Sequence, residues 1–235
     1  MLVTVKSFGG DLFSLFYPNL CIGCRKALLS NEHLLCLRCA DDLPVTNHFT
    51  DPDNQLIKRF AGRVPVKGAA ALLHFSKHGP VQQLLHELKY RGQTEVGTYF
   101  GQLAAYQLRQ SYSVVPAVDI VVPVPLHWKK QRVRGYNQCD SFAQAIAEGL
   151  AIDWTTEALE RIHENVSQTK QSRFDRYGNV ANIFGLKKPE LLQGKHVLLV
   201  DDVFTTGATS EACLNTILQV PGTMVSFVSI AAAVR

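Results

Sequence analysis

Apolar runs and amphipathic segments alternate along most of the chain after about residue 60. Short, nearly continuous apolar runs predict buried strands over residues 69–75, 119–124, 197–200 and 225–230. Helices are predicted around these strands, over residues 81–90, 99–110, 141–150 and 211–219. Apolar strands separated by helices are typical of a parallel sheet covered on both faces. We therefore expect an α/β fold with a parallel sheet and flanking helices.

The first part of the chain has a different pattern, dominated by cysteine. Cys21 and Cys24 form one Cys-x-x-Cys pair, and Cys36 and Cys39 form a second. This spacing lets four thiolates converge on one tetrahedral ion, and Zn²⁺ is the expected metal. A site closed by four sulfurs is structural, and its metal supplies folding free energy to a module too small to bury much surface.

Two other interpretations of the cysteines remain open. His33 lies between the two pairs and could replace one cysteine as a ligand. The pairs could also be redox-active, although a thioredoxin-like site would use a single pair at the start of a helix. Residues 51–63 are polar and contain Pro52 and Gly62, which is typical of a linker. We expect a zinc module and linker over residues 1–60 and the α/β domain over residues 61–235.

Composition narrows the class of protein. A chain of 235 residues suits one α/β domain plus a small module, and 46% hydrophobic residues exclude a disordered chain. The net charge of +4 mildly favours anionic partners.

No apolar run reaches the roughly 18–20 residues that span a bilayer, so we expect no membrane insertion. The N-terminus lacks a secretory pattern and the cysteine pairs favour metal in a reducing compartment, so we expect the cytoplasm. Cys139 and Cys213 are expected to be buried or half-buried thiols.

Asp201 and Asp202 follow the apolar run at residues 197–200 and precede a small, hydroxyl-rich segment and a helix. The N–H groups at a helix start hold phosphate well, and Gly207 and Ala208 allow close approach. Adjacent carboxylates at a strand end need hydroxyl donors or a cation. A ribose diol supplies hydroxyls and Mg²⁺ on a neighbouring pyrophosphate supplies charge. The segment therefore predicts a site for a phosphorylated ribose, unless the acidic pair merely caps the helix.

Cationic side chains gather in a second segment, directly after the strand predicted at residues 119–124. We expect this segment to be a flexible loop that binds pyrophosphate, although a solvated basic turn is the alternative. Lys89 and Arg91, at the end of a predicted helix, add a third cationic position. The expected pyrophosphate-binding residues are Lys129, Lys130, Arg132, Arg134, Gly135, Lys89 and Arg91. The long polar stretch over residues 161–179 is expected to be a lid, with Gln168, Thr169, Arg176 and Asn179 over the ligand.

The segment over residues 197–209, Val-Leu-Leu-Val-Asp-Asp-Val-Phe-Thr-Thr-Gly-Ala-Thr, resembles the signature of type I phosphoribosyltransferases for 5-phosphoribosyl-1-pyrophosphate (PRPP). Together with the cysteine pairs, Leu-Lys-Tyr-Arg-Gly at 88–92, Pro-Val-Pro-Leu-His at 123–127 and Arg-Gly-Tyr-Asn-Gln at 134–138, it makes nearly the whole chain resemble the ComF-type competence proteins, including gluconate-linked relatives. The resemblance implies a zinc module on a phosphoribosyltransferase-like domain that binds PRPP with Mg²⁺.

The same resemblance assigns roles to residues. Asp201 and Asp202 would hold the ribose hydroxyls, and the 5′-phosphate would lie on Thr205, Thr206, Gly207, Ala208 and Thr209. The family is associated with uptake of single-stranded DNA in natural transformation. Single-stranded DNA, a competence helicase and DNA-processing proteins are therefore the partners it implies.

Two classes of function remain open at this point. The chain could be an enzyme that transfers a phosphoribosyl group from PRPP, including one of nucleobase salvage; His127 is the nearest candidate base. It could instead be a non-catalytic PRPP or nucleotide sensor that binds single-stranded DNA through aromatic side chains among cations. The aromatic residues in question are Tyr90, Trp128, Tyr136, Phe174 and Tyr177.

Overall fold

The computed structural model describes residues 18–111, 114–163 and 183–233. It divides the chain into two compact units, Met1–Leu43 and Pro44–Arg235. The sequence pattern placed the start of the second module near residue 61. In the structure, Leu56 and Phe60 of helix α3 (Gln55–Phe60) are fully buried members of the core of the second unit. The division thus falls before the polar segment that was predicted to be a linker.

The first unit contains little regular structure among its described residues. Its helix α2 (Leu37–Asp41) is short, and an isolated bridge joins Leu20 to Ala27. The backbone N–H of Ile22 donates to the carbonyl of Leu34, and both side chains are buried. A core this small is typical of a module that needs a metal or another cross-link to stay folded.

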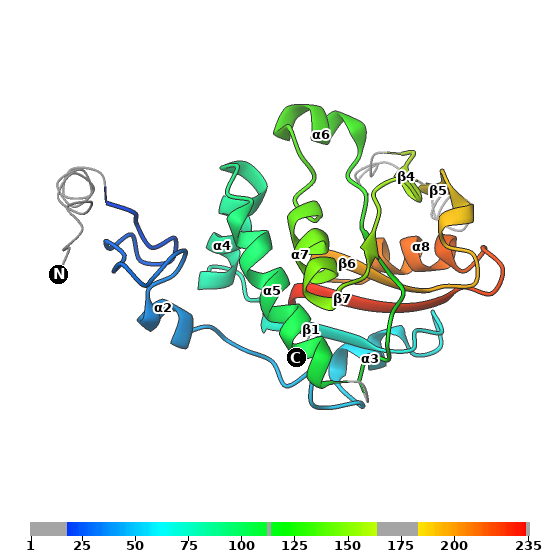
Figure 1. Ribbon diagram of the computed structural model, residues 1–235, viewed down its shortest axis with the longest axis horizontal. Helices are drawn as coiled ribbons and strands as arrows, with labels where there is room; N and C mark the ends of the chain where they lie inside the picture. The colour runs from blue at the N-terminus through cyan, green and yellow to red at the C-terminus, as the bar shows by residue number, and fades with distance from the viewer. Residues whose placement is uncertain (1–17, 112–113, 164–182, 234–235) are drawn as a thin grey trace, which may run out of the picture. The chain divides into compact units, whose positions relative to one another are not determined.

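A five-stranded sheet forms the centre of the second unit (Figure 1). Its strands are β1 (Ala69–His74), β2 (Ile120–Pro123), β3 (Asp153–Trp154), β6 (His196–Phe204) and β7 (Met224–Ala232). They lie in the order β1-β7-β6-β2-β3, and every neighbouring pair is parallel. The predicted α/β fold with a parallel sheet is confirmed.

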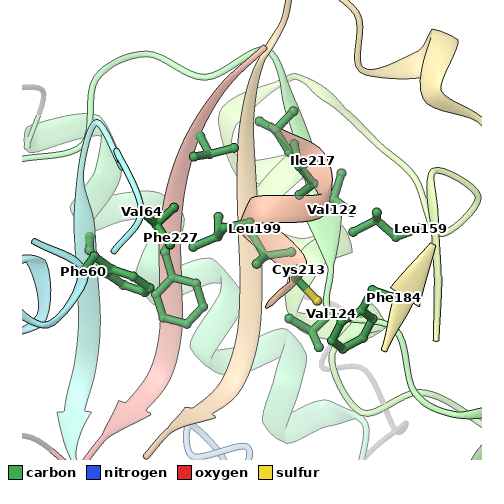
Figure 2. Packing of buried hydrophobic residues seen from close by; sticks show 14 of the residues in the cluster. Phe60, Val64, Val122, Val124, Leu159, Phe184, Leu199, Cys213, Ile217 and Phe227 are labelled. Atoms are coloured by element: carbon green, nitrogen blue, oxygen red, sulfur yellow. The ribbon is translucent and has the colours of Figure 1, made fainter. Parts of the chain in front are cut away.

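Helices cover both faces of this sheet. On one face, α3 and α8 (Ala208–Ile217) enclose a core that contains Phe60 and Phe227 (Figure 2). The rings of Phe60, Phe204 and Phe227 pack edge to face, with centroids 5.4–5.7 Å apart. Cys213 of α8 is a fully buried member of that core.

On the other face lie α5 (Glu95–Gln110) and α7 (Asp140–Leu150), which pack closely (Figure 1). A Cβ atom at Gly101 of α5 would lie 2.6 Å from that of Ala145 of α7, so only glycine allows this approach. The remaining described elements are α4 (Pro80–Tyr90), α6 (Trp128–Arg134), the short 3₁₀ helix η1 (Pro189–Leu191) and an antiparallel pair, β4 (Leu159–Arg161) with β5 (Phe184–Leu186).

Two segments near the predicted site differ from expectation. Strand β6 was expected to end at Val200, but it continues through Asp201 and Asp202 to Phe204 because β7 pairs with it as far as Phe204↔Ala232. The segment expected to be a flexible basic loop is in fact helix α6. His127 caps its first turn, and Gly135 ends it with a φ of +81° that favours glycine. Among the described residues, no helix is both long enough and apolar enough to cross a bilayer.

Candidate functional site

A hollow of about 190 Å³ opens at the carboxyl ends of the neighbouring strands β2 and β6. Ligands of open parallel sheets commonly bind at this edge. The hollow is lined by Lys89, Val124, Pro125, Leu126, Lys130, Arg134, Gln138, Arg161, Asp201, Asp202, Val203 and Thr209. Four of these side chains are cationic and two are acidic, so the site suits an anion that also carries hydroxyl groups.

Asp201 and Asp202 lie at this edge and are only 8% and 3% exposed. Oδ1 of Asp201 accepts the N–H of Asp202 at 2.8 Å and the thiol of Cys139 at 3.5 Å. Burial, together with the neighbouring Asp202, raises the pKa of Asp201 to about 7. Two adjacent buried acids oppose folding, and such groups cluster at functional sites.

Lys89 supplies the counter-charge from the last turn of α4. Its Nζ lies 2.9 Å from Oδ2 of Asp202, and the two side chains are 23% and 5% exposed. Burial alone would lower the pKa of Lys89, but the nearby carboxylates of Asp202 and Asp201 outweigh it and raise that pKa. Arg91, predicted beside Lys89, is the exposed residue that ends α4, and it does not line the hollow.

Helix α6 brings two of its four cations to the hollow. Lys130 and Arg134 are one helical turn apart and both line it. The guanidinium of Arg134 lies 4.8 Å above the ring of Tyr90, and its Nη1 donates to Oε1 of Gln138 at 2.8 Å. The two other cations of α6 do not line the hollow: Lys129 and Arg132 lie 5.7 and 6.0 Å from the ring centre of Trp128.

The segment after α6 is fixed to the rest of the unit by hydrogen bonds. Nδ2 of Asn137 donates to the carbonyl of Val124 at 3.1 Å, and the hydroxyl of Tyr136 donates to the carbonyl of Leu88. These bonds tie α6 to β2 and α4, and thereby set the position of Arg134. Nδ1 of His127 accepts the N–H of Lys129 at 3.3 Å, so this buried histidine acts as a helix cap, and it does not line the hollow.

The predicted phosphate segment forms the turn between β6 and α8. Thr205 and Thr206 are exposed, and Gly207 is buried with a φ of +86°. A Cβ atom at Gly207 would lie 2.7 Å from the ring of Phe204, so a larger residue would clash as well as strain the backbone. Helix α8 begins at Ala208, and Thr209, in its first turn, is the residue of this group that lines the hollow.

Sequence reasoning missed one cation of the site. Arg161, at the end of β4, lines the hollow, and its guanidinium lies 5.4 Å from the ring centre of Phe184 on β5. The only signal in the sequence was its place at the start of the long polar stretch. The predicted lid residues Gln168, Thr169, Arg176 and Asn179 lie outside the described residues, as do Phe174 and Tyr177.

The four cysteines of the first unit come together as predicted. Their sulfur atoms all lie within 4.8 Å of one another, and His33 is not part of this group. Burial alone would raise the pKa of Cys21, but N–H donors led by Cys36 outweigh it and lower that pKa to about 6. Burial and the neighbouring thiols raise the pKa of Cys39 to about 12. A shared cation would remove this conflict, so the cluster is compatible with a structural metal.

Comparison with known proteins found similar proteins that are named for DNA utilization or for competence. No family model matches the chain. It is 32% identical over 132 residues to the DNA utilization protein YhgH of Salmonella typhi, which covers 55% of this chain and 57% of that protein. It is 27% identical over 196 residues to competence protein F of Haemophilus influenzae, which covers 81% of this chain and 80% of that protein.

Solved structures were compared as well. Adenine phosphoribosyltransferase from Leishmania tarentolae is similar at 13% identity with a TM-score of 0.40, over 68% of this chain and 90% of the other. The chain spans little more than half the length of the YhgH proteins that it matches. The resemblance indicated by the motifs is nonetheless confirmed, and the chain is a relative of the competence F and YhgH proteins.

Proposed function

We propose that this chain is a PRPP-binding, phosphoribosyltransferase-like protein that acts in the uptake or use of single-stranded DNA. One observation carries the proposal. The buried pair Asp201 and Asp202, at the carboxyl end of β6, lines a hollow that also holds Lys89, Lys130, Arg134 and Arg161. A ligand with a diol between two phosphate groups matches this combination of acceptors and cations.

The chemistry of each part of the hollow supports one arrangement of the ligand. The ribose hydroxyls donate to Asp201 and Asp202, and the 5′-phosphate lies on the turn over residues 205–209 at the start of α8. The pyrophosphate, with Mg²⁺, lies toward Lys130 and Arg134, because guanidinium groups bind phosphate oxygens in bidentate fashion. The residues of the proposed lid would complete the site.

For the first unit we propose a structural Zn²⁺ bound by Cys21, Cys24, Cys36 and Cys39. Such a site requires reduced thiols, and all six cysteines of the chain are free. Reduced thiols persist in the cytoplasm, which supports our proposal of that location.

The DNA part of the proposal rests on the relatives, whose names are competence protein F and DNA utilization protein. A specific observation also favours a second candidate function, a non-catalytic PRPP sensor that binds single-stranded DNA. The ring of Trp128 is 56% exposed and lies near Lys129 and Arg132. An exposed aromatic ring beside cations is the arrangement on which bases stack. A competence helicase or DNA-processing proteins would be partners in either case.

Turnover of PRPP separates an enzyme that transfers a phosphoribosyl group from the non-catalytic sensor. The full chain is incubated with labelled PRPP, Mg²⁺ and a panel of nucleobases and single-stranded DNA, and release of pyrophosphate is measured. Release that depends on one acceptor supports an enzyme. PRPP binding without release for any acceptor supports the sensor.

Salt dependence tests the DNA part. Contacts between cations and phosphates predict that the affinity for single-stranded DNA falls steeply as salt rises. Replacement of Trp128 by Ala should weaken binding by about fivefold or more, since stacking contributes about 1–3 kcal/mol per base. No binding even at low salt would contradict the DNA role.

A further inference from the structure

The acidic pair at the hollow already has a cation of its own. Nζ of Lys89 lies 2.9 Å from Oδ2 of Asp202, and the two side chains are 23% and 5% exposed. Lys89 reaches this position from the last turn of α4. The carbonyl of Leu88, the residue before it, accepts a hydrogen bond from the hydroxyl of Tyr136. Because the pair is largely withdrawn from water, losing either partner would leave a buried charge without compensation.

The contacts of the two carboxylates leave them able to accept hydrogen bonds from a ligand. Oδ1 of Asp201 accepts the N–H of Asp202 and the thiol of Cys139, and Oδ2 of Asp202 faces Lys89. These are the hydrogen bonds and the ion pair that the two carboxylates make with other residues in the described part of the chain. The second oxygen of each is therefore left to accept the hydroxyls of a diol.

Lys89 also offsets much of the negative charge of this pair. Burial of Asp201, together with the proximity of Asp202, raises the pKa of Asp201 to about 7. Near neutral pH Asp201 is therefore about half protonated, which reduces the negative charge that the ammonium group of Lys89 has to balance. A divalent cation bound to Oδ2 of Asp202 would have to displace Lys89.

We propose that Lys89 is the built-in counter-ion of the acidic pair, so that the ribose end of the ligand binds without a divalent cation and Mg²⁺ acts on the pyrophosphate alone. This assigns Lys89 to positioning the diol acceptors, in place of the pyrophosphate contact predicted from sequence. The proposal rests on the proposed function, and it names ribose 5-phosphate as a ligand that needs no metal.

The test compares two ligands by calorimetric titration into the full chain. Ribose 5-phosphate and PRPP are each titrated in magnesium-free buffer and in buffer with Mg²⁺. No chelator is added, because it would compete for a metal at the cysteine cluster. The dissociation constant of ribose 5-phosphate should change by less than about twofold between the two buffers, whereas PRPP should bind at least about tenfold more tightly with Mg²⁺.

Variants of Lys89 test whether its charge is the reason that ribose 5-phosphate binds without Mg²⁺. Lys89→Met keeps the aliphatic stem but removes the charge; it should weaken ribose 5-phosphate binding by at least about tenfold in magnesium-free buffer and recover part of the loss with Mg²⁺. Lys89→Arg should stay within about threefold of the original protein. Lys58→Met is the matched control, because Lys58 pairs with Asp53 at 2.7 Å on an exposed surface, and it should leave binding unchanged.

The outcomes are distinguishable. If ribose 5-phosphate binds the original protein more than about tenfold better with Mg²⁺, or if a folded Lys89→Met variant binds as well as the original, the inference is overturned while PRPP binding stands. The first of these results needs no variant and so does not depend on the folding of Lys89→Met. If neither ligand binds in any buffer, the proposed function fails and takes the inference with it.

Discussion

The thiol of Cys139, directly before α7, donates to Oδ1 of Asp201 at a sulfur–oxygen distance of 3.5 Å. Cys139 is fully buried, and its burial, with the two nearby carboxylates, raises the pKa of its thiol. It therefore remains protonated and able to donate. Cys139, which the sequence predicted only to be a buried or half-buried thiol, thus contacts the acidic pair on which the proposed ligand depends.

Replacement of Cys139 by Ala should weaken PRPP binding by about threefold to tenfold, because Asp201 loses one of its two donors. Cys139→Ser keeps a donor and should bind more tightly than the Ala variant. Cys213→Ala is the matched control, since Cys213 is equally buried but lies in the core cluster. Calorimetric titration measures affinity and thermal unfolding measures stability. Equal loss of affinity in Cys139→Ala and Cys213→Ala would show that the thiol contact has no specific role.

The pKa of Asp201 predicts how stability depends on pH. Because the folded-state pKa is raised from 3.8 to about 7, the folded protein holds a proton that the unfolded chain releases between those values. The group therefore costs no stability below pH 3.8, costs more as pH rises toward 7, and costs its full amount above 7.

Asp201→Asn should accordingly raise the free energy of unfolding at about pH 8 by at least about 1 kcal/mol, and by much less at about pH 4. Urea unfolding followed by tryptophan fluorescence measures this, since Trp128 and Trp154 both lie in the second unit. A variant that is less stable than the original at the higher pH would contradict the assigned environment of Asp201.

The two faces of α6 should differ in function. Lys130→Gln and Arg134→Gln remove cations that line the hollow, and each should weaken PRPP binding by about tenfold while changing ribose 5-phosphate binding little. Lys129→Gln and Arg132→Gln remove cations beside Trp128, and each should change PRPP binding by less than about twofold. Titration of both ligands into all four variants tests this. Equal losses at all four positions would instead favour the uniform basic loop expected from sequence.

The cysteine cluster should be a structural site confined to the first unit. Cys24 is exposed, so Cys24→Ser removes a ligand without disturbing packing, and it should lose bound zinc. His33→Ala is the control, and it should retain zinc because His33 lies outside the group of sulfur atoms. Metal content and tryptophan fluorescence are measured together. Unfolding of the second unit in Cys24→Ser would show that the first unit is required for the whole chain.

The parallel sheet could be predicted because its strands are short apolar runs that need cover on both faces. The end of β6 could not, since Asp201 and Asp202 break the apolar pattern while β7 continues to pair with them. Helix α6 was missed for a similar reason. It is polar on nearly all sides, and its limits are set by the cap at His127 and the left-handed Gly135.

The acidic pair and the four cysteines could be identified from sequence because their neighbours in the chain form the motif. The ion pair of Lys89 with Asp202 and the place of Arg161 at the hollow could not. Both contacts join residues far apart in the sequence, and their geometry depends on how α4 and β4 pack around the end of β6. The local sequence shows that each of the two residues is cationic, but it does not identify the acid or the ligand that the side chain contacts.

Calorimetric titration of PRPP with Mg²⁺ into the double variant Asp201→Asn/Asp202→Asn is the decisive test of whether this acidic pair binds the ribose. We expect the original protein to bind PRPP, and the double variant to remain folded but to bind at least about a hundredfold more weakly, because both carboxylate acceptors of the ribose hydroxyls are replaced by amides. Binding of PRPP by the folded double variant with the original affinity would contradict the assignment of the acidic pair as the ribose site.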